Sequence, residues 1–154
     1  MAQIKEGSKA PSFEGIDQSG NRIKLSDYKG KKLVLYFYPK DDTPGCTAEA
    51  CNLRDNHESL LKKGFAVIGV SPDSEKSHKK FAGKFSLPFP LLADESKKIL
   101  NDYGVWGEKK MYGKTYLGVI RTTFIIDEKG IIEKIINKVD TASHTEQILD
   151  LYKQ

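Results

Sequence analysis

The sequence lacks several features that would mark large classes of protein. Its 154 residues include only two cysteines and three histidines, and no apolar run approaches the length of a membrane span. Cys46, Cys51 and His57 do not have the Cys-x-x-Cys spacing of structural zinc sites, and no fourth ligand is evident beside them. The histidines His57, His78 and His144 are therefore not expected to bind a metal, and we predict neither a metal nor another cofactor.

The chain also lacks a strong excess of charge. It has 25 basic and 21 acidic residues, a formal net charge of +4, and its lysines are scattered rather than grouped. Neither nucleic acid nor a membrane surface is therefore an expected partner. Residues 1–8 contain no apolar core of signal-peptide length, so we expect a cytoplasmic protein, and the length fits one domain over residues 1–154.

The two cysteines lie in the stretch that suggests chemistry. Residues 33–38 form a short apolar run typical of a buried strand, and residues 47–62 favour a helix. Between them, Thr43 is an expected N-cap and Pro44 an expected first helical residue. Cys46 then lies in the first helical turn, where unpaired backbone N–H groups and the helix dipole favour an anion. We expect Cys46 to be available as a thiolate, the nucleophilic form of cysteine.

The spacing of the cysteines limits how they can pair. On an intact helix, residues five apart have Cα atoms roughly 8.7 Å from one another. A disulfide requires Cα atoms within about 7 Å, so Cys46 and Cys51 cannot bond while the helix is intact. In a reducing cytoplasm such a pair is more often catalytic or metal-binding than structural. A bond between them would have to form and break with local unwinding.

The remaining pattern predicts an α/β protein. We expect an N-terminal β-hairpin over residues 13–25, a loop over residues 105–118, and a closing helix over residues 141–153. Further strands are expected at residues 32–38, 65–71, 91–94, 122–127 and 131–139, and further helices at residues 74–86 and 96–103. Helices between the central strands imply right-handed crossovers and at least one parallel strand pair.

Two motifs resemble those of a known family. Pro39-x-x-x-Thr43-x-x-Cys46 resembles the peroxiredoxin active-site signature. The fuller string of residues 43–51, followed by Leu53-Arg54-Asp55, resembles the peroxiredoxin Q group, also called bacterioferritin comigratory protein. The similarity extends to residues 104–109 and 118–127. It implies a thioredoxin-like sandwich, with a central mixed sheet flanked by helices and an N-terminal β-hairpin.

The resemblance also assigns roles to five residues. Cys46 would be the peroxidatic nucleophile, Thr43 would contact the thiolate and a bound peroxide, and Pro39 would shield the pocket from water. Arg121 would stabilise the thiolate and hold peroxide oxygens. Cys51 would resolve the Cys46 sulfenic acid as an intramolecular disulfide. Plainer alternatives are a simple N-cap at Thr43, a strand end at Pro39 and a surface salt bridge at Arg121.

Neighbouring charges in the motif are harder to interpret. Glu49 and Arg54 match the family string, but the sequence supplies no necessary role for either. Glu49 could assist proton movement at the start of the helix. A charge on the outer face of the helix is the plainer interpretation.

The resemblance predicts a monomeric peroxidase that reduces hydrogen peroxide and organic hydroperoxides. Thioredoxin or a similar dithiol protein would recycle the disulfide, and the scheme needs no haem, flavin or metal. A disulfide oxidoreductase is an alternative enzyme, and a redox-sensing or chaperone-like binding module is an alternative outside enzymes. Thr43 stands where thioredoxin-like oxidoreductases have their first cysteine, and Arg121-Thr122-Thr123 lacks their proline, so disulfide exchange is disfavoured.

Overall fold

The computed structural model describes residues 4–153, apart from the side chain of Met111. Residues 1–3 and 154 of the predicted domain lie outside this range. Within it, no helix is both long enough and apolar enough to cross a bilayer.

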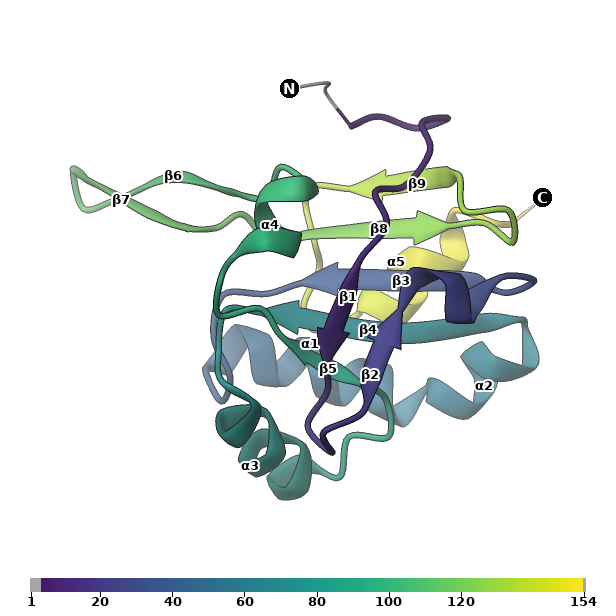
Figure 1. Ribbon diagram of the computed structural model, residues 1–154, viewed down its shortest axis with the longest axis horizontal. Helices are drawn as coiled ribbons and strands as arrows, with labels where there is room; N and C mark the ends of the chain where they lie inside the picture. Colours follow the sequence, from purple (N-terminus) through teal and green to yellow (C-terminus); the bar gives the residue numbers. More distant parts are fainter. Residues whose placement is uncertain (1–3, 154) are drawn as a thin grey trace.

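A five-stranded mixed sheet forms the centre of the fold (Figure 1). Its strand order is β5-β4-β3-β8-β9, with β3 parallel to β4, β4 parallel to β5, and both β3–β8 and β8–β9 antiparallel. The strands are β3 (Lys32–Phe37), β4 (Phe65–Ser71), β5 (Leu91–Ala93), β8 (Thr122–Ile126) and β9 (Ile132–Ile136). Each of the three central strands is almost wholly buried, which explains their continuous apolar sequences.

Both faces of the sheet are covered. Alternate residues of β3 divide between the faces, with Leu33 and Leu35 in one apolar cluster and Val34 and Tyr36 in the other. One face carries the hairpin of β1 (Glu14–Ile16) and β2 (Arg22–Lys24), the 3-10 turn η1 (Leu25–Tyr28) and helix α4 (Lys98–Asp102) (Figure 1). The other carries the remaining helices, which are α1 (Pro44–Asp55), α2 (His57–Lys62), α3 (Glu75–Phe85) and α5 (His144–Asp150). The predicted sandwich, mixed sheet and N-terminal hairpin are confirmed.

The expectation of a loop at residues 105–118 is wrong. This segment forms the antiparallel hairpin of β6 (Trp106–Met111) and β7 (Lys114–Val119), which projects beyond the main sheet (Figure 1). Tyr112 and Gly113 form its turn, and both have a positive φ, as a two-residue hairpin turn requires. The strands of this ribbon are largely exposed, so they lack the alternating apolar pattern that identifies a half-buried strand.

The helix predicted at residues 96–103 is shortened to α4 (Lys98–Asp102), and two further predicted helices differ from those observed. The expected helix at residues 47–62 is divided at Asn56, whose side chain donates to the Asn52 carbonyl while its own backbone leaves the helical conformation. Helix α5 covers only residues 144–150 of the predicted 141–153. Both differences occur where polar side chains offer the backbone alternative hydrogen bonds.

Helix caps provide a stability test of these boundaries. Ser74 caps α3, where its hydroxyl accepts a hydrogen bond from the Ser77 N–H, whereas Ser143 has the N-cap position of α5 without a side-chain cap. Ser74→Ala should therefore lower the free energy of unfolding by about 1 kcal/mol. Ser143→Ala should change it by less than about 0.5 kcal/mol. Urea unfolding followed by circular dichroism measures both, and equal losses would contradict the assignment.

Candidate functional site

Cys46 lies in the first turn of α1, as the sequence predicts. Pro44 is the first helical residue. The first backbone hydrogen bond of the helix runs from the Thr47 N–H to the Thr43 carbonyl at 2.8 Å, so Cys46 lies just before it. Its side chain packs in the apolar cluster beneath the helix, and the residue is 2% exposed. The thiol therefore lies at the anion-favouring end of a helix and is almost wholly shielded from solvent.

Arg121 reaches Cys46 from the opposite side of the site. The pairing of Phe37 with Thr122 brings the start of β8 beside the end of β3, where the loop leading to α1 begins. From there the Arg121 guanidinium Nη2 donates to Cys46 Sγ at 3.3 Å. Its Nη1 donates to Glu49 Oε1 at 2.6 Å. One cation therefore bridges a thiol and a carboxyl, and the plainer interpretation of Arg121 as a surface salt bridge is wrong.

Gly45 allows this approach. A Cβ atom on Gly45 would lie 3.3 Å from Arg121 Nη2, tighter than an ordinary van der Waals contact. The glycine therefore leaves room for the guanidinium over the first turn of the helix, and a methyl group here would require Arg121 to shift by a few tenths of an ångström.

Glu49 is buried, contrary to its interpretation as an exposed helix-face charge. Its side chain is 0% exposed, one helical turn after Cys46. Burial raises the pKa of this carboxyl to about 7, against the opposing effect of the Arg121 guanidinium. The sequence did indicate that Cys46 and Glu49 share a face of the helix, because they are three residues apart. It did not indicate that this face packs against the rest of the protein.

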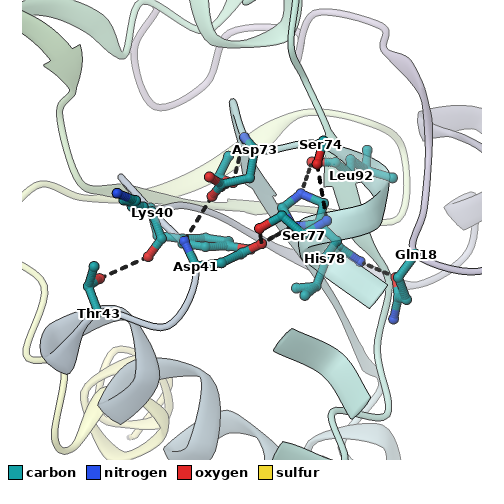
Figure 2. Close-up of polar contacts among 12 residues, drawn as sticks. Gln18, Lys40, Asp41, Thr43, Asp73, Ser74, Ser77, His78 and Leu92 are labelled. Carbon is teal, nitrogen blue, oxygen red and sulfur yellow. Dashed lines mark hydrogen bonds and ion pairs between the residues drawn. The ribbon is translucent and has the colours of Figure 1, made fainter. Parts of the chain in front are cut away.

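Thr43 and Pro39 lie in the loop between β3 and α1. Both are half-buried. Thr43 Oγ1 donates to the Lys40 carbonyl at 2.8 Å and makes no capping bond to α1, so the N-cap interpretation holds for its position but not for its hydroxyl (Figure 2). Because that proton is committed to a carbonyl, the hydroxyl oxygen keeps lone pairs that can accept from a hydroperoxide O–H.

A buried polar network fixes this loop to the body of the protein. Asp41 Oδ1 accepts from the Tyr38 hydroxyl at 2.6 Å, and Asp41 Oδ2 lies 2.7 Å from His78 Nδ1. The Asp41 N–H donates to Asp73 Oδ2 at 2.8 Å, and His78 Nε2 donates to the Leu92 carbonyl at 2.9 Å (Figure 2). The loop that carries Pro39 and Thr43 is therefore held by α3 and the ends of β4 and β5.

The same network is the one place within residues 4–153 where three potential metal ligands converge. Oxygen and nitrogen atoms of Asp41, Asp73 and His78 lie within 4.8 Å of one another. Their facing atoms already bond to one another, and the Ser71 and Ser77 hydroxyls donate to Asp73 Oδ2 and Asp41 Oδ2 at 2.7 Å. These hydrogen bonds account for the cluster as a structural support of the loop.

Cys51 lies in the same helix as Cys46 and is half-buried, and both residues are free thiols. The next residue, Asn52, ties this part of α1 to α5. Asn52 Oδ1 accepts from the Thr145 N–H at 2.7 Å, and Asn52 Nδ2 donates to the Ala142 carbonyl at 3.1 Å. These contacts fix the part of α1 that directly follows Cys51.

The chain is similar in sequence to known proteins. Residues 7–135 match the AhpC/TSA family. Peroxiredoxin Bcp of Bacillus subtilis is 49% identical over 150 residues, which cover 97% of this chain and 96% of that protein. Peroxiredoxin Bcp of Escherichia coli is 43% identical over 154 residues, which cover 100% of this chain and 99% of that protein.

Solved structures show the same fold. A cysteine-to-serine mutant of PrxQ from Xylella fastidiosa superposes with a TM-score of 0.91 at 31% identity, covering 99% of this chain and 97% of that one. The bacterioferritin comigratory protein of Xanthomonas campestris superposes with a TM-score of 0.84 at 36% identity, covering 90% and 88%.

The contact at Gly45 can be tested by adding one methyl group. Gly45→Ala should push Arg121 away from Cys46 and slow the reaction of Cys46 with an oxidant by about fivefold, because a charge-assisted hydrogen bond is lengthened. Gly83→Ala is the matched control, since no atom lies within 4 Å of a Cβ at this helical glycine. That control should keep the rate and gain about 0.5–1 kcal/mol of stability. Stopped-flow oxidation kinetics measure the rates, and an unchanged rate in Gly45→Ala would contradict the steric role.

Proposed function

This chain belongs to the AhpC/TSA family and is a peroxiredoxin, a thiol peroxidase, and we propose that Cys46 is its peroxidatic residue and Cys51 its resolving residue. The supporting observation is the 3.3 Å contact between Arg121 Nη2 and Cys46 Sγ at the start of α1. A permanently charged guanidinium and the end of a helix both favour the thiolate at this position.

In the first step, the Cys46 thiolate attacks the terminal oxygen of a hydroperoxide. An S–O bond forms as the O–O bond breaks, so sulfur is oxidised to sulfenic acid and the peroxide is reduced. The departing oxygen carries the electron pair and takes up a proton to become an alcohol or water. Arg121 stabilises the developing charge, while Thr43 accepts a hydrogen bond from the hydroperoxide and Pro39 limits the entry of water.

In the second step, Cys51 attacks the sulfur of the Cys46 sulfenic acid. An S–S bond forms, the S–O bond breaks, and the hydroxyl leaves as water after it takes up a proton. Because an intact α1 holds the Cα atoms too far apart, the helix has to unwind between the two residues. The reaction therefore alternates between a folded α1 that attacks peroxide and an unwound α1 that forms the disulfide.

Thioredoxin or a similar dithiol protein restores both thiols by disulfide exchange in this proposal. The bacterioferritin comigratory protein of Xanthomonas campestris has an alkyl peroxide reduction activity. We extend that substrate class to this chain, together with hydrogen peroxide. We further propose that one domain acts as a monomer in the reducing cytoplasm, since every residue assigned here to the reaction lies in the same chain.

Three variants test the division of roles. Cys46→Ser should abolish thioredoxin-coupled peroxide consumption, because the nucleophile is removed. Cys51→Ser should still consume about one equivalent of peroxide and accumulate a sulfenic acid, which dimedone labelling and mass spectrometry detect, but should turn over poorly. Lys62→Gln is the control, because its exposed ion pair with Glu58 in α2 lies outside the site.

Equal activity in the wild type, Cys46→Ser and Cys51→Ser would contradict the assignment of the two cysteines. Reduction of insulin without consumption of peroxide would instead support a general disulfide oxidoreductase. Loss of turnover in Lys62→Gln would show that the assay responds to any disturbance of the helices.

A further inference from the structure

The second oxygen of Glu49 is an unusual feature of the site. Glu49 Oε1 accepts from Arg121, but among the described residues no donor reaches Glu49 Oε2, which is fully buried. The group facing this oxygen is the ring of His144 at the start of α5, whose Nε2 lies 3.6 Å away. His144 is itself 0% exposed. A buried carboxyl oxygen without a hydrogen bond is costly, so the protonation states of this pair need an explanation.

The neighbours of His144 determine which of its nitrogens carries the proton. The Gln147 amide is oriented by two backbone groups: its Nε2 donates to the Lys138 carbonyl at 2.7 Å, and its Oε1 accepts from the Asp140 N–H at 2.9 Å. Because Gln147 Oε1 also lies 2.9 Å from His144 Nδ1, that nitrogen must be the donor. In the neutral ring Nε2 is then an acceptor, and the Thr123 hydroxyl, 2.9 Å away, donates to it.

The charge balance of the site points to the same pair of side chains, Glu49 and His144. A thiolate at Cys46, a carboxylate at Glu49 and the Arg121 cation would together leave a net charge of −1 in a largely buried site. Retaining one proton on either acidic group makes the site neutral, which burial favours. If Cys46 is the thiolate, that proton belongs on Glu49, and its free oxygen Oε2 faces the acceptor nitrogen of His144. His144 Nε2 has a single lone pair, so a hydrogen bond from protonated Glu49 would close the 3.6 Å gap and displace the Thr123 hydroxyl from that nitrogen.

We propose that His144 is a positioning residue of the peroxidase reaction. Its Nε2 accepts a hydrogen bond from protonated Glu49, so the positive charge of Arg121 is balanced by the Cys46 thiolate. This inference rests on the proposed role of Cys46. The proton lost by the Cys46 thiol moves to Glu49, so the site neither gains nor loses charge. After the O–O bond breaks, the proton returns, directly or through water, to the departing oxyanion, and Glu49 is again the ionised partner of Arg121.

The other groups around the pair agree with this exchange. Burial raises the pKa of Glu49 to about 7, so the carboxyl can take up and release a proton near neutrality. Burial lowers the pKa of His144, with the Arg121 charge acting in the same direction and Asp140 opposing it, so the ring stays neutral and can accept. Tyr36 of β3 also faces the site, and burial, together with Glu49 and Cys46, raises its pKa and keeps it neutral.

Sulfenic acid formation in a Cys51→Ser background tests the proposal. His144→Leu removes the acceptor, so the proton should return to the Cys46 thiol and the oxidation rate should fall by about tenfold between about pH 6 and pH 7. At about pH 9, where hydroxide in the solvent can take up the proton, the deficit should shrink to about twofold or less. His144→Gln, which can place an amide oxygen near Nε2, should recover most of the rate.

His57→Leu is the matched control, because it also removes an imidazole. His57 lies in α2, is partly buried and packs on Phe89. It should keep the wild-type rate and pH profile. A deficit in His144→Leu that is equal at all pH values would indicate a purely structural role and overturn the proposal. An unchanged rate with normal peroxide consumption would overturn it while leaving the function of Cys46 intact.

A second measurement does not depend on the folding of a variant. Nitrogen-15 NMR of the imidazole in the otherwise wild-type chain should show His144 as the neutral Nδ1–H tautomer from about pH 5 to pH 9, because burial disfavours the charged ring. Observation of the Nε2–H tautomer would overturn the proposal, since that nitrogen would then donate to Glu49 and stabilise its ionised form.

Discussion

The Arg121 guanidinium, shared between Cys46 and Glu49, is the contact on which the rest of the site depends. Its two bonds come from separate nitrogens, 3.3 Å to the sulfur and 2.6 Å to the carboxyl oxygen, so the cation is held in a fixed orientation rather than as a mobile charge. Several local features serve this contact. The antiparallel pairing of β3 with β8 brings the arginine beside α1, and Gly45 leaves room for it.

The two steps of the proposed reaction require opposite states of the start of α1, one intact and one unwound. In the proposed reaction, attack on peroxide requires the first turn to be intact, because the helix end and Arg121 stabilise the thiolate together. The proposed disulfide requires the stretch between Cys46 and Cys51 to unwind, next to the hydrogen bonds of Asn52 to α5, each worth about 1 kcal/mol. These bonds stabilise the reduced form. They also link the part of α1 next to Cys51 to α5, which carries His144. The residues proposed for the two steps of the reaction therefore share one structural support.

Much of the fold could be predicted from the sequence, because the central strands are continuous apolar runs and the helix starts carry serine, threonine or proline. The β6–β7 hairpin could not, since both faces of the ribbon are largely solvated and no apolar period marks it. Local sequence also predicted that Cys46 lies at the start of a helix and that residues 39–43 form a turn. The burial of Glu49 could not be predicted, because it depends on α5 and β8, which are distant in sequence and cover one face of α1.

The most direct measurement for this account is the ultraviolet thiolate absorbance of Cys46 at neutral pH in a Cys51→Ser background, with and without the charge at Arg121. The account predicts that Arg121→Gln lowers this absorbance by a large fraction while leaving the far-ultraviolet circular dichroism unchanged. Equal thiolate absorbance in the two proteins would contradict the claim that Arg121 holds Cys46 as an anion.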